Sequence, residues 1–170
     1  MTSPNPISAS EPDWSREAKP LTAWIPSRSL LASIRAYQHH AARHGPGHAL
    51  LMRCAVLRHR FWQVVTGTDI PLNSRIGGGL LLPHPNGVVI HPEVTIGPNC
   101  LLFQQVTLGA AGDGVPTIGG HVDIGAGAKV LGPVRIGNHV RIGANAVVLI
   151  DLPDGAVAVG IPARIVNGPV

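Results

Sequence analysis

The strongest constraint in this sequence is a six-residue period that runs through its C-terminal part. From residue 70 onward an aliphatic side chain recurs at every sixth position, with one eight-residue step and one ten-residue step. The 13 positions in this register are all Ile, Leu or Val: Ile70, Ile76, Leu82, Ile90, Ile96, Leu102, Leu108, Ile118, Ile124, Val130, Ile136, Ile142 and Val148. A fixed short period of this kind is the sequence signature of a repeat fold.

A second small or apolar residue stands four positions after most of these residues: Val94, Cys100, Val106, Val122, Ala128, Val134, Val140, Ala146 and Leu152. This is the hexapeptide pattern of a parallel β-helix, in which six residues form a short strand plus a turn and three such units close a triangular rung. Each aliphatic residue points inward and stacks on its equivalent about 4.8 Å away in the next rung. The narrow interior explains why only 4% of residues are aromatic.

The two irregular steps mark excursions from this prism, at residues 83–89 and 109–117. Loops that project from a rigid scaffold are where catalytic and binding residues tend to lie. The first excursion contains His84, which makes this histidine a candidate functional residue.

The sequence before the repeat divides into two further parts. Residues 1–28 are rich in Pro and Ser without periodicity, so we expect a loose N-terminal arm. Residues 29–66 show helical spacing, with Ser29 as a candidate N-cap and a break at residues 45–47, so we expect two amphipathic helices. We expect the apolar face of the second helix to be covered; it contains Leu50, Cys54, Leu57, Phe61 and Val64. Residues 67–170 then form the β-helix domain.

Composition excludes several classes of protein. Two cysteines in 170 residues exclude a disulfide scaffold and a four-cysteine zinc site. No apolar stretch approaches the roughly 18 residues of a membrane span, and no signal-peptide core is present, so we predict a cytoplasmic protein without a membrane span. Residues 1–68 hold eight basic and three acidic side chains. Because no nucleic-acid-binding module accompanies them, we interpret the arginines as a solvated helical face and expect no nucleic-acid partner.

Four segments together resemble a known family over roughly residues 61–166. They are His84 in the first excursion, residues 105–109 (QVTLG), residues 124–129 (IGAGAK) and residues 159–166 (VGIPARIV). They resemble the serine O-acetyltransferase branch of the hexapeptide-repeat acyltransferases. The resemblance implies a mainly β protein with a left-handed parallel β-helix, assembled as a homotrimer. It also implies that acetyl-CoA binds as cosubstrate in the groove between neighbouring prisms.

The same resemblance implies roles for two catalytic residues. His84 matches the family's general base, and Asp69, 15 residues earlier, matches the carboxylate that supports it. A hydroxyl is a poor nucleophile at neutral pH, so a base must remove its proton as it attacks the thioester; such a base is worth on the order of 10²–10⁴ in rate. A carboxylate bound to the other ring nitrogen fixes the tautomer and stabilises the imidazolium.

The cofactor-binding candidates come from the same carry-over. Ala126 and Ala144 match positions that contact CoA through their backbone, and Arg164 matches a basic residue that meets the nucleotide phosphates. The tetrahedral oxyanion needs a backbone N–H, and Gly109, at the start of the longer loop, is a candidate donor.

The identity of the acceptor hydroxyl stays open at this stage. Pro83, Gly114 and Val115 depart from the family's serine-binding pattern. We therefore predict an O-acetyltransferase for a small, serine-like acceptor, with a sugar or polysaccharide precursor as the alternative. A trimeric zinc hydratase and a non-catalytic scaffold are remoter alternatives. The hydratase needs two histidines about five residues apart, and His121 has none at that spacing, so no metal is expected.

Overall fold

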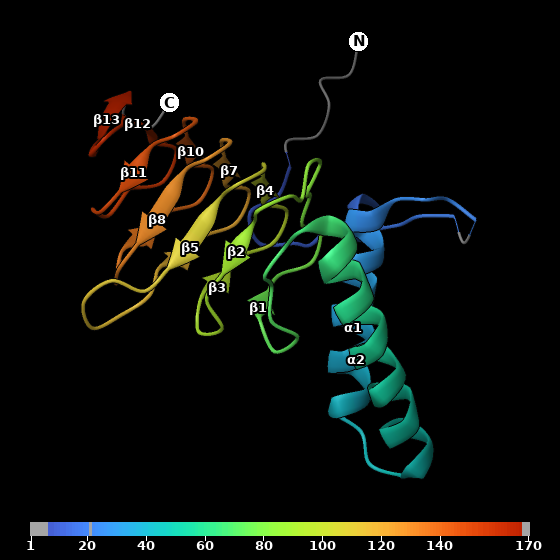
Figure 1. Ribbon diagram of the computed structural model, residues 1–170. Helices are drawn as coiled ribbons and strands as arrows, with labels where there is room; N and C mark the ends of the chain where they lie inside the picture. The colour runs from blue at the N-terminus through green and yellow to red at the C-terminus, as the bar shows by residue number, and fades with distance from the viewer. Residues whose placement is uncertain (1–6, 21, 168–170) are drawn as a thin grey trace.

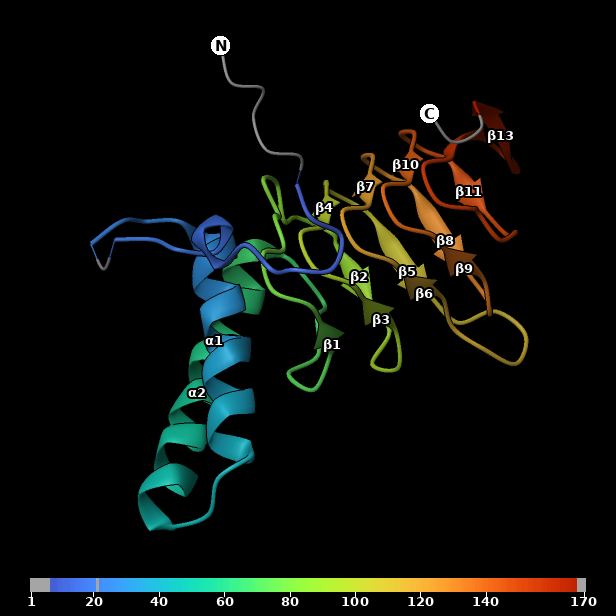
Figure 2. The ribbon, with the colours of Figure 1, turned by 180° about the vertical axis from the view of Figure 1, so that it is seen from behind.

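The computed structural model describes residues 7–20 and 22–167. A helical hairpin lies against one end of a column of short strands, and the chain then winds away from the hairpin toward its C-terminus (Figures 1 and 2). A short 3₁₀ turn, η1 (Trp14–Arg16), precedes the two helices α1 (Pro26–Ala41) and α2 (Pro46–Thr66). No helix in the described part of the chain has the length and apolar content needed to cross a bilayer.

The column consists of three mainly parallel sheets that share one core. Its strands are β1 (Arg75–Ile76), β2 (Val89–Ile90), β3 (Thr95–Ile96), β4 (Leu101–Leu102), β5 (Thr107–Gly109), β6 (Thr117–Ile118), β7 (Asp123–Ile124), β8 (Lys129–Leu131), β9 (Arg135–Ile136), β10 (Arg141–Ile142), β11 (Val147–Val148), β12 (Val157–Gly160) and β13 (Ala163–Asn167). The sheet orders are β1-β3-β6-β9, β4-β7-β10-β12-β13 and β2-β5-β8-β11. Only β12 and β13 pair in antiparallel fashion among these strands.

The six-residue register is confirmed as the core of this column. All 13 aliphatic residues of the register are at most 6% exposed, and they stack in register, as Ile90, Leu108, Val130 and Val148 do through β2, β5, β8 and β11. The predicted left-handed β-helix fold is therefore confirmed.

The excursions lengthen single rungs without breaking the register. Ile118 pairs with Ile136 across an ordinary rung. Ile76 pairs with Ile96 across the rung that contains residues 83–89, and Ile96 pairs with Ile118 across the rung that contains residues 109–117. Extra residues therefore project from the corners, as the sequence predicts.

The helical hairpin covers the open end of the first rung, where backbone groups have no strand below to bond with. An open edge leaves unpaired N–H and C=O groups, and proteins usually cover such edges. Side chains of the helices donate to first-rung carbonyls: His59 to Ile70 (2.9 Å), Gln38 to Ser74 (2.9 Å), and Arg35 to Ile76 (2.7 Å) and Gly77 (2.8 Å). The hairpin therefore terminates the prism by hydrogen bonding as well as by apolar packing.

The prediction of a loose arm over residues 1–28 differs from the structure in the described part. Asn99 anchors this segment: its side-chain amide donates to the carbonyls of Ser8 and Glu11 (both 2.8 Å) and accepts from the N–H of Asp13 (2.8 Å). Close approach is possible because the prism corner here has glycine, and a Cβ at Gly120 would clash with the carbonyl of the arm at residue 9. Residues 1–6 and 21 lie outside the described residues, and the three-part division of the chain stays a prediction.

Two details of the helix prediction are wrong. Helix α1 begins at Pro26, a residue favoured at the first helical position, so Ser29 is buried within the first turn and is not an N-cap. The expected apolar face of α2 is exposed, with Leu50, Leu57, Phe61 and Val64 between 54% and 84% accessible.

Candidate active site

One corner of the prism collects His84 and both predicted alanines. Backbone hydrogen bonds align successive rungs there: Asn145 N–H donates to Ala126 O (2.8 Å), Gly127 N–H to Gln104 O (2.8 Å), and Gln105 N–H to Asn86 O (2.9 Å). We call this column, formed by residues 83–87, 103–105, 125–127 and 143–145, the site corner. Although 60 positions separate His84 from Ala144 in the sequence, they lie on the first and fourth of four consecutive rungs.

Asp69 lies beside the lower end of the site corner. Its N–H donates to Val88 O and its carbonyl accepts from Ile90 N–H (both 2.9 Å), so it pairs with the strand that follows the His84 excursion. The side chains of both Asp69 and His84 are exposed. No hydrogen bond joins them in the described part of the chain, so their action as a pair stays a prediction.

A cleft of about 400 Å³ opens next to His84. It lies between the start of α1, the end of α2 and the first excursion, and its lining consists of Trp24, Ile25, Pro26, Ser27, Val65, Thr66, Pro83, His84, Pro85 and Asn86. No Asp, Glu, Lys or Arg contributes to it. The cleft therefore offers hydroxyl, amide and imidazole groups on an otherwise apolar surface.

The remaining predicted residues lie farther along the column. Ala126 and Ala144 lie in the turns that follow β7 and β10, and neither is buried. Arg164 lies on β13, at the C-terminal edge of the same sheet, with an exposed side chain whose guanidinium donates to Ala163 O (3.0 Å). Gly109 ends β5 on the neighbouring sheet, so one chain by itself does not bring it to the site corner. Its role as an oxyanion donor stays a prediction.

Gln104 is a candidate that sequence reasoning missed. It lies at the site corner between Asn86 and Ala126, and its side-chain oxygen is buried without a hydrogen-bond partner among the described residues. A buried amide oxygen without a partner costs free energy unless a ligand supplies a donor. The signal in the sequence was its position one ordinary rung, 18 residues, after Asn86 in the excursion.

The cysteines show no sign of a catalytic role. Cys100 is fully buried, and burial raises the pKa of its thiol to about 11, so the reactive thiolate is scarce at neutral pH. Cys54 is exposed on α2, away from the site corner. The interpretation of Cys100 as a packing residue is therefore confirmed by its burial.

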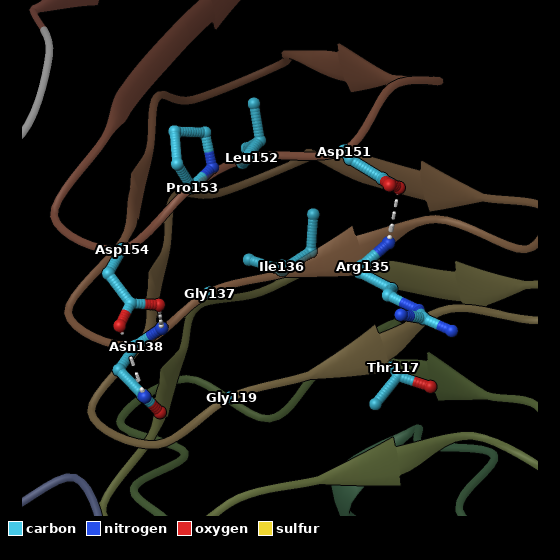
Figure 3. Close-up of a pocket in the computed structure, with 10 residues that line it drawn as sticks. All are labelled: Thr117, Gly119, Arg135, Ile136, Gly137, Asn138, Asp151, Leu152, Pro153 and Asp154. Carbon is cyan, nitrogen blue, oxygen red and sulfur yellow. Dashed lines mark hydrogen bonds between the residues drawn. The ribbon is translucent and has the colours of Figure 1, made fainter.

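A second depression, of about 440 Å³, lies on a different face of the column and contains none of the predicted site residues. Figure 3 shows its two acidic ends: the Asp151 carboxylate accepts from the Arg135 backbone N–H, and the Asp154 carboxylate from the Asn138 N–H (both 2.7 Å). These bonds tie residues 151–154 to the preceding rung. Within the described ranges, no group of three or more His, Cys, Asp or Glu side chains is arranged to hold a metal ion.

Comparison with known proteins defines the class of this fold. Residues 116–149 match the family description "Bacterial transferase hexapeptide (six repeats)". Over these residues the β-helix is similar to hexapeptide-repeat transferases.

Within that class the chain is similar to serine acetyltransferases. It is 44% identical over 108 residues to the serine acetyltransferase of Synechococcus elongatus, an alignment that covers 61% of this chain and 44% of the relative. Among solved structures, a serine acetyltransferase in complex with CoA has a TM-score of 0.71 at 32% identity, covering 84% of this chain and 58% of that one. A serine acetyltransferase in complex with cysteine has the same TM-score and identity, covering 85% and 56%. The chain thus spans about half the length of these relatives.

Proposed function

We propose that this protein is an acetyl-CoA-dependent O-acetyltransferase of the serine acetyltransferase type. The observation that carries the proposal is the site corner, a column of four rungs that holds the His84 excursion and the two small residues Ala126 and Ala144. Similarity to a serine acetyltransferase that binds CoA supports acetyl-CoA as the donor. The homotrimer and the cytoplasmic location stay predictions.

The proposed reaction is a direct transfer. His84 removes the proton of the acceptor hydroxyl, and the oxygen attacks the thioester carbonyl of acetyl-CoA to form a tetrahedral intermediate. When that intermediate collapses, the C–S bond breaks and the imidazolium returns the proton to the CoA thiolate. Asp69 holds the imidazole in the tautomer that accepts the proton. No acyl-enzyme is needed, so neither cysteine takes part.

Ala126, Ala144 and Gln104 are proposed to bind the carrier. Small side chains at 126 and 144 leave backbone groups accessible to an extended chain, and the unpaired Gln104 oxygen accepts from a donor such as a pantetheine amide. Arg164 supplies a guanidinium for the nucleotide phosphates.

The composition of the cleft favours a second candidate acceptor. Because no Asp, Glu, Lys or Arg side chain lines it, the ammonium and carboxylate of serine find no ion-pair partner there within one chain. The exposed indole of Trp24 and the neutral polar groups suit the hydroxyls and apolar ring face of a sugar. A sugar or polysaccharide precursor is therefore the alternative acceptor.

An acceptor screen tests both proposals. Serine, homoserine, threonine and simple sugars are each incubated with acetyl-CoA, and the acetylated product is identified by mass spectrometry. The exposed Cys54 reacts with thiol reagents, so CoA release requires a protein-only blank. We expect His84→Ala to lower turnover by roughly 10²–10⁴, while His91→Ala, a histidine at another corner, leaves it unchanged. Turnover that survives His84→Ala would refute the mechanism.

A further inference from the structure

Two histidines that the proposed transfer does not use stand on top of each other at a different corner of the prism. His121 and His139 are one rung apart, and their Nδ1 atoms are 2.8 Å from each other. Their rings meet edge to face, with centroids 5.0 Å apart and planes at 77°. Two ring nitrogens at this distance share either a proton or a metal ion.

The backbone holds this pair in place. His121 N–H donates to Pro98 O (2.8 Å) and His139 N–H to Gly120 O (3.0 Å), and the residue after each histidine, Val122 or Val140, is fully buried. Both histidines adopt the left-handed conformation, with φ of 51° and 57°. Equal conformations on consecutive rungs direct both rings to the same side, so the pair is preorganised.

We propose that His121 and His139 form a chelating site for a divalent transition-metal ion with cis nitrogen ligands, Cu²⁺ or Ni²⁺. Two bonds of about 2.0 Å at a right angle bring the nitrogens to about 2.8 Å, whereas the tetrahedral angle of zinc requires about 3.3 Å. Water completes the coordination. This site is independent of the acetyl transfer.

The charges around the pair are compatible with a bound cation. Burial lowers the pKa of His121, and His139 and Arg16 add to that effect while Asp123 opposes it. Burial favours the neutral imidazole, which is the form that binds metal. Asp123 supplies a nearby negative charge.

A second histidine pair fits a cation less well. His40 and His48 join the two helices with their Nδ1 atoms 3.1 Å apart. An arginine lies near each pair, Arg16 on the prism and Arg43 here, but only Arg16 is opposed by an acidic group, Asp123. No acidic residue occurs between positions 18 and 68. The pair on the prism is therefore the favoured site.

Copper titration followed by electron paramagnetic resonance tests the proposal. The test variants are His121→Asn and His139→Asn, because Asn99 already occupies the same corner one rung lower with a φ of 61°, so asparagine fits this backbone. We expect the copper bound per chain to fall by one equivalent in each variant, with loss of the coupling to two nitrogens. His91→Asn serves as the control, and unchanged melting of the metal-free variants shows that the fold is retained.

Three outcomes would overturn the site. The first is that the wild-type protein binds no copper equivalent coupled to two nitrogens. The second is that either variant retains that copper equivalent, and the third is that His48→Asn alone removes it. The readout is independent of catalysis, so failure of the acetyltransferase proposal leaves this test intact.

Discussion

Arg35 on α1 offers a sharp test of how the helical hairpin terminates the prism. Its guanidinium donates to the carbonyls of Ile76 and Gly77 and to both oxygens of Glu17, at 2.7 to 3.1 Å. The Glu17 carboxylate in turn accepts from the N–H groups of Gly79 (2.9 Å) and Leu80 (3.2 Å). One ion pair therefore joins the arm, α1 and the first rung.

Replacement of Arg35 by Ala removes one partner of a largely buried pair, in which the side chains are 21% and 9% exposed. Removing one partner of a buried ion pair costs about 3–5 kcal/mol, and the partial exposure of Arg35 argues for the lower end, about 3 kcal/mol. We expect Arg35→Lys to recover only part of this, because an ammonium lacks the planar fork that reaches two carbonyls and a carboxylate together. The free energy of unfolding, measured by urea titration, checks both values.

Arg58→Ala is the matched control. Arg58 is exposed and makes one hydrogen bond, to Ala32 O (2.7 Å), so its loss is expected to cost less than about 1 kcal/mol. A double-mutant cycle of Arg35→Ala with Glu17→Ala is expected to show a coupling of about 1–3 kcal/mol. If Arg35→Ala and Arg58→Ala were equally mild, the ion pair would not hold the hairpin to the prism.

Three further predictions concern the core and the helices. Burial lowers the pKa of His59 from 6.5, so the unfolded chain takes up a proton first and the free energy of unfolding falls as the pH drops below about 6.5. Urea titration at pH 7.5 and 5.5 is expected to show a smaller loss of this free energy for His59→Gln than for the wild type. Equal losses in the two proteins would contradict the reasoning. In Gly97→Ala, the new Cβ lies 2.6 Å from the Gly119 backbone, so the free energy of unfolding is expected to fall by about 1–3 kcal/mol. An unchanged urea midpoint would argue against this close packing. Mass spectrometry after alkylation at pH 8 is expected to find label on Cys54 and none on Cys100 until the protein unfolds.

The column of the β-helix was predictable from the sequence because one geometric requirement repeats in every rung. A residue such as Leu108 or Val130 has to fill the same space as its neighbour one rung away, so the choice of residue type is the same each time. The irregular steps also predicted the excursions, because extra residues in a closed rung can only project outward from a corner.

The composition of the site corner was only partly predictable. The position of His84 in an excursion was visible in the sequence, and Ala126 and Ala144 came from the family resemblance. Gln104 follows Asn86 by 18 residues, an ordinary rung, so its place at this corner was readable from the sequence; the burial of its side-chain oxygen without a partner was not. The cleft next to His84 depends on Trp24 and Val65, which no periodic pattern connects to it.

Helix α2 shows why apolar periodicity by itself selected the wrong face. The side that contacts α1 and the prism carries Ala55, His59, Trp62 and Thr66, which follow helical spacing as regularly as the exposed apolar residues do. An open strand edge requires donors for its carbonyls as well as apolar cover, and a buried carbonyl without a partner costs about 1–3 kcal/mol. His59, with its ring between Ser33 (3.0 Å) and Ile70 O (2.9 Å), meets that requirement, which a leucine cannot do. Where a helix covers the end of a sheet, its inward face is therefore better predicted from polar residues at helical spacing than from its most apolar stripe.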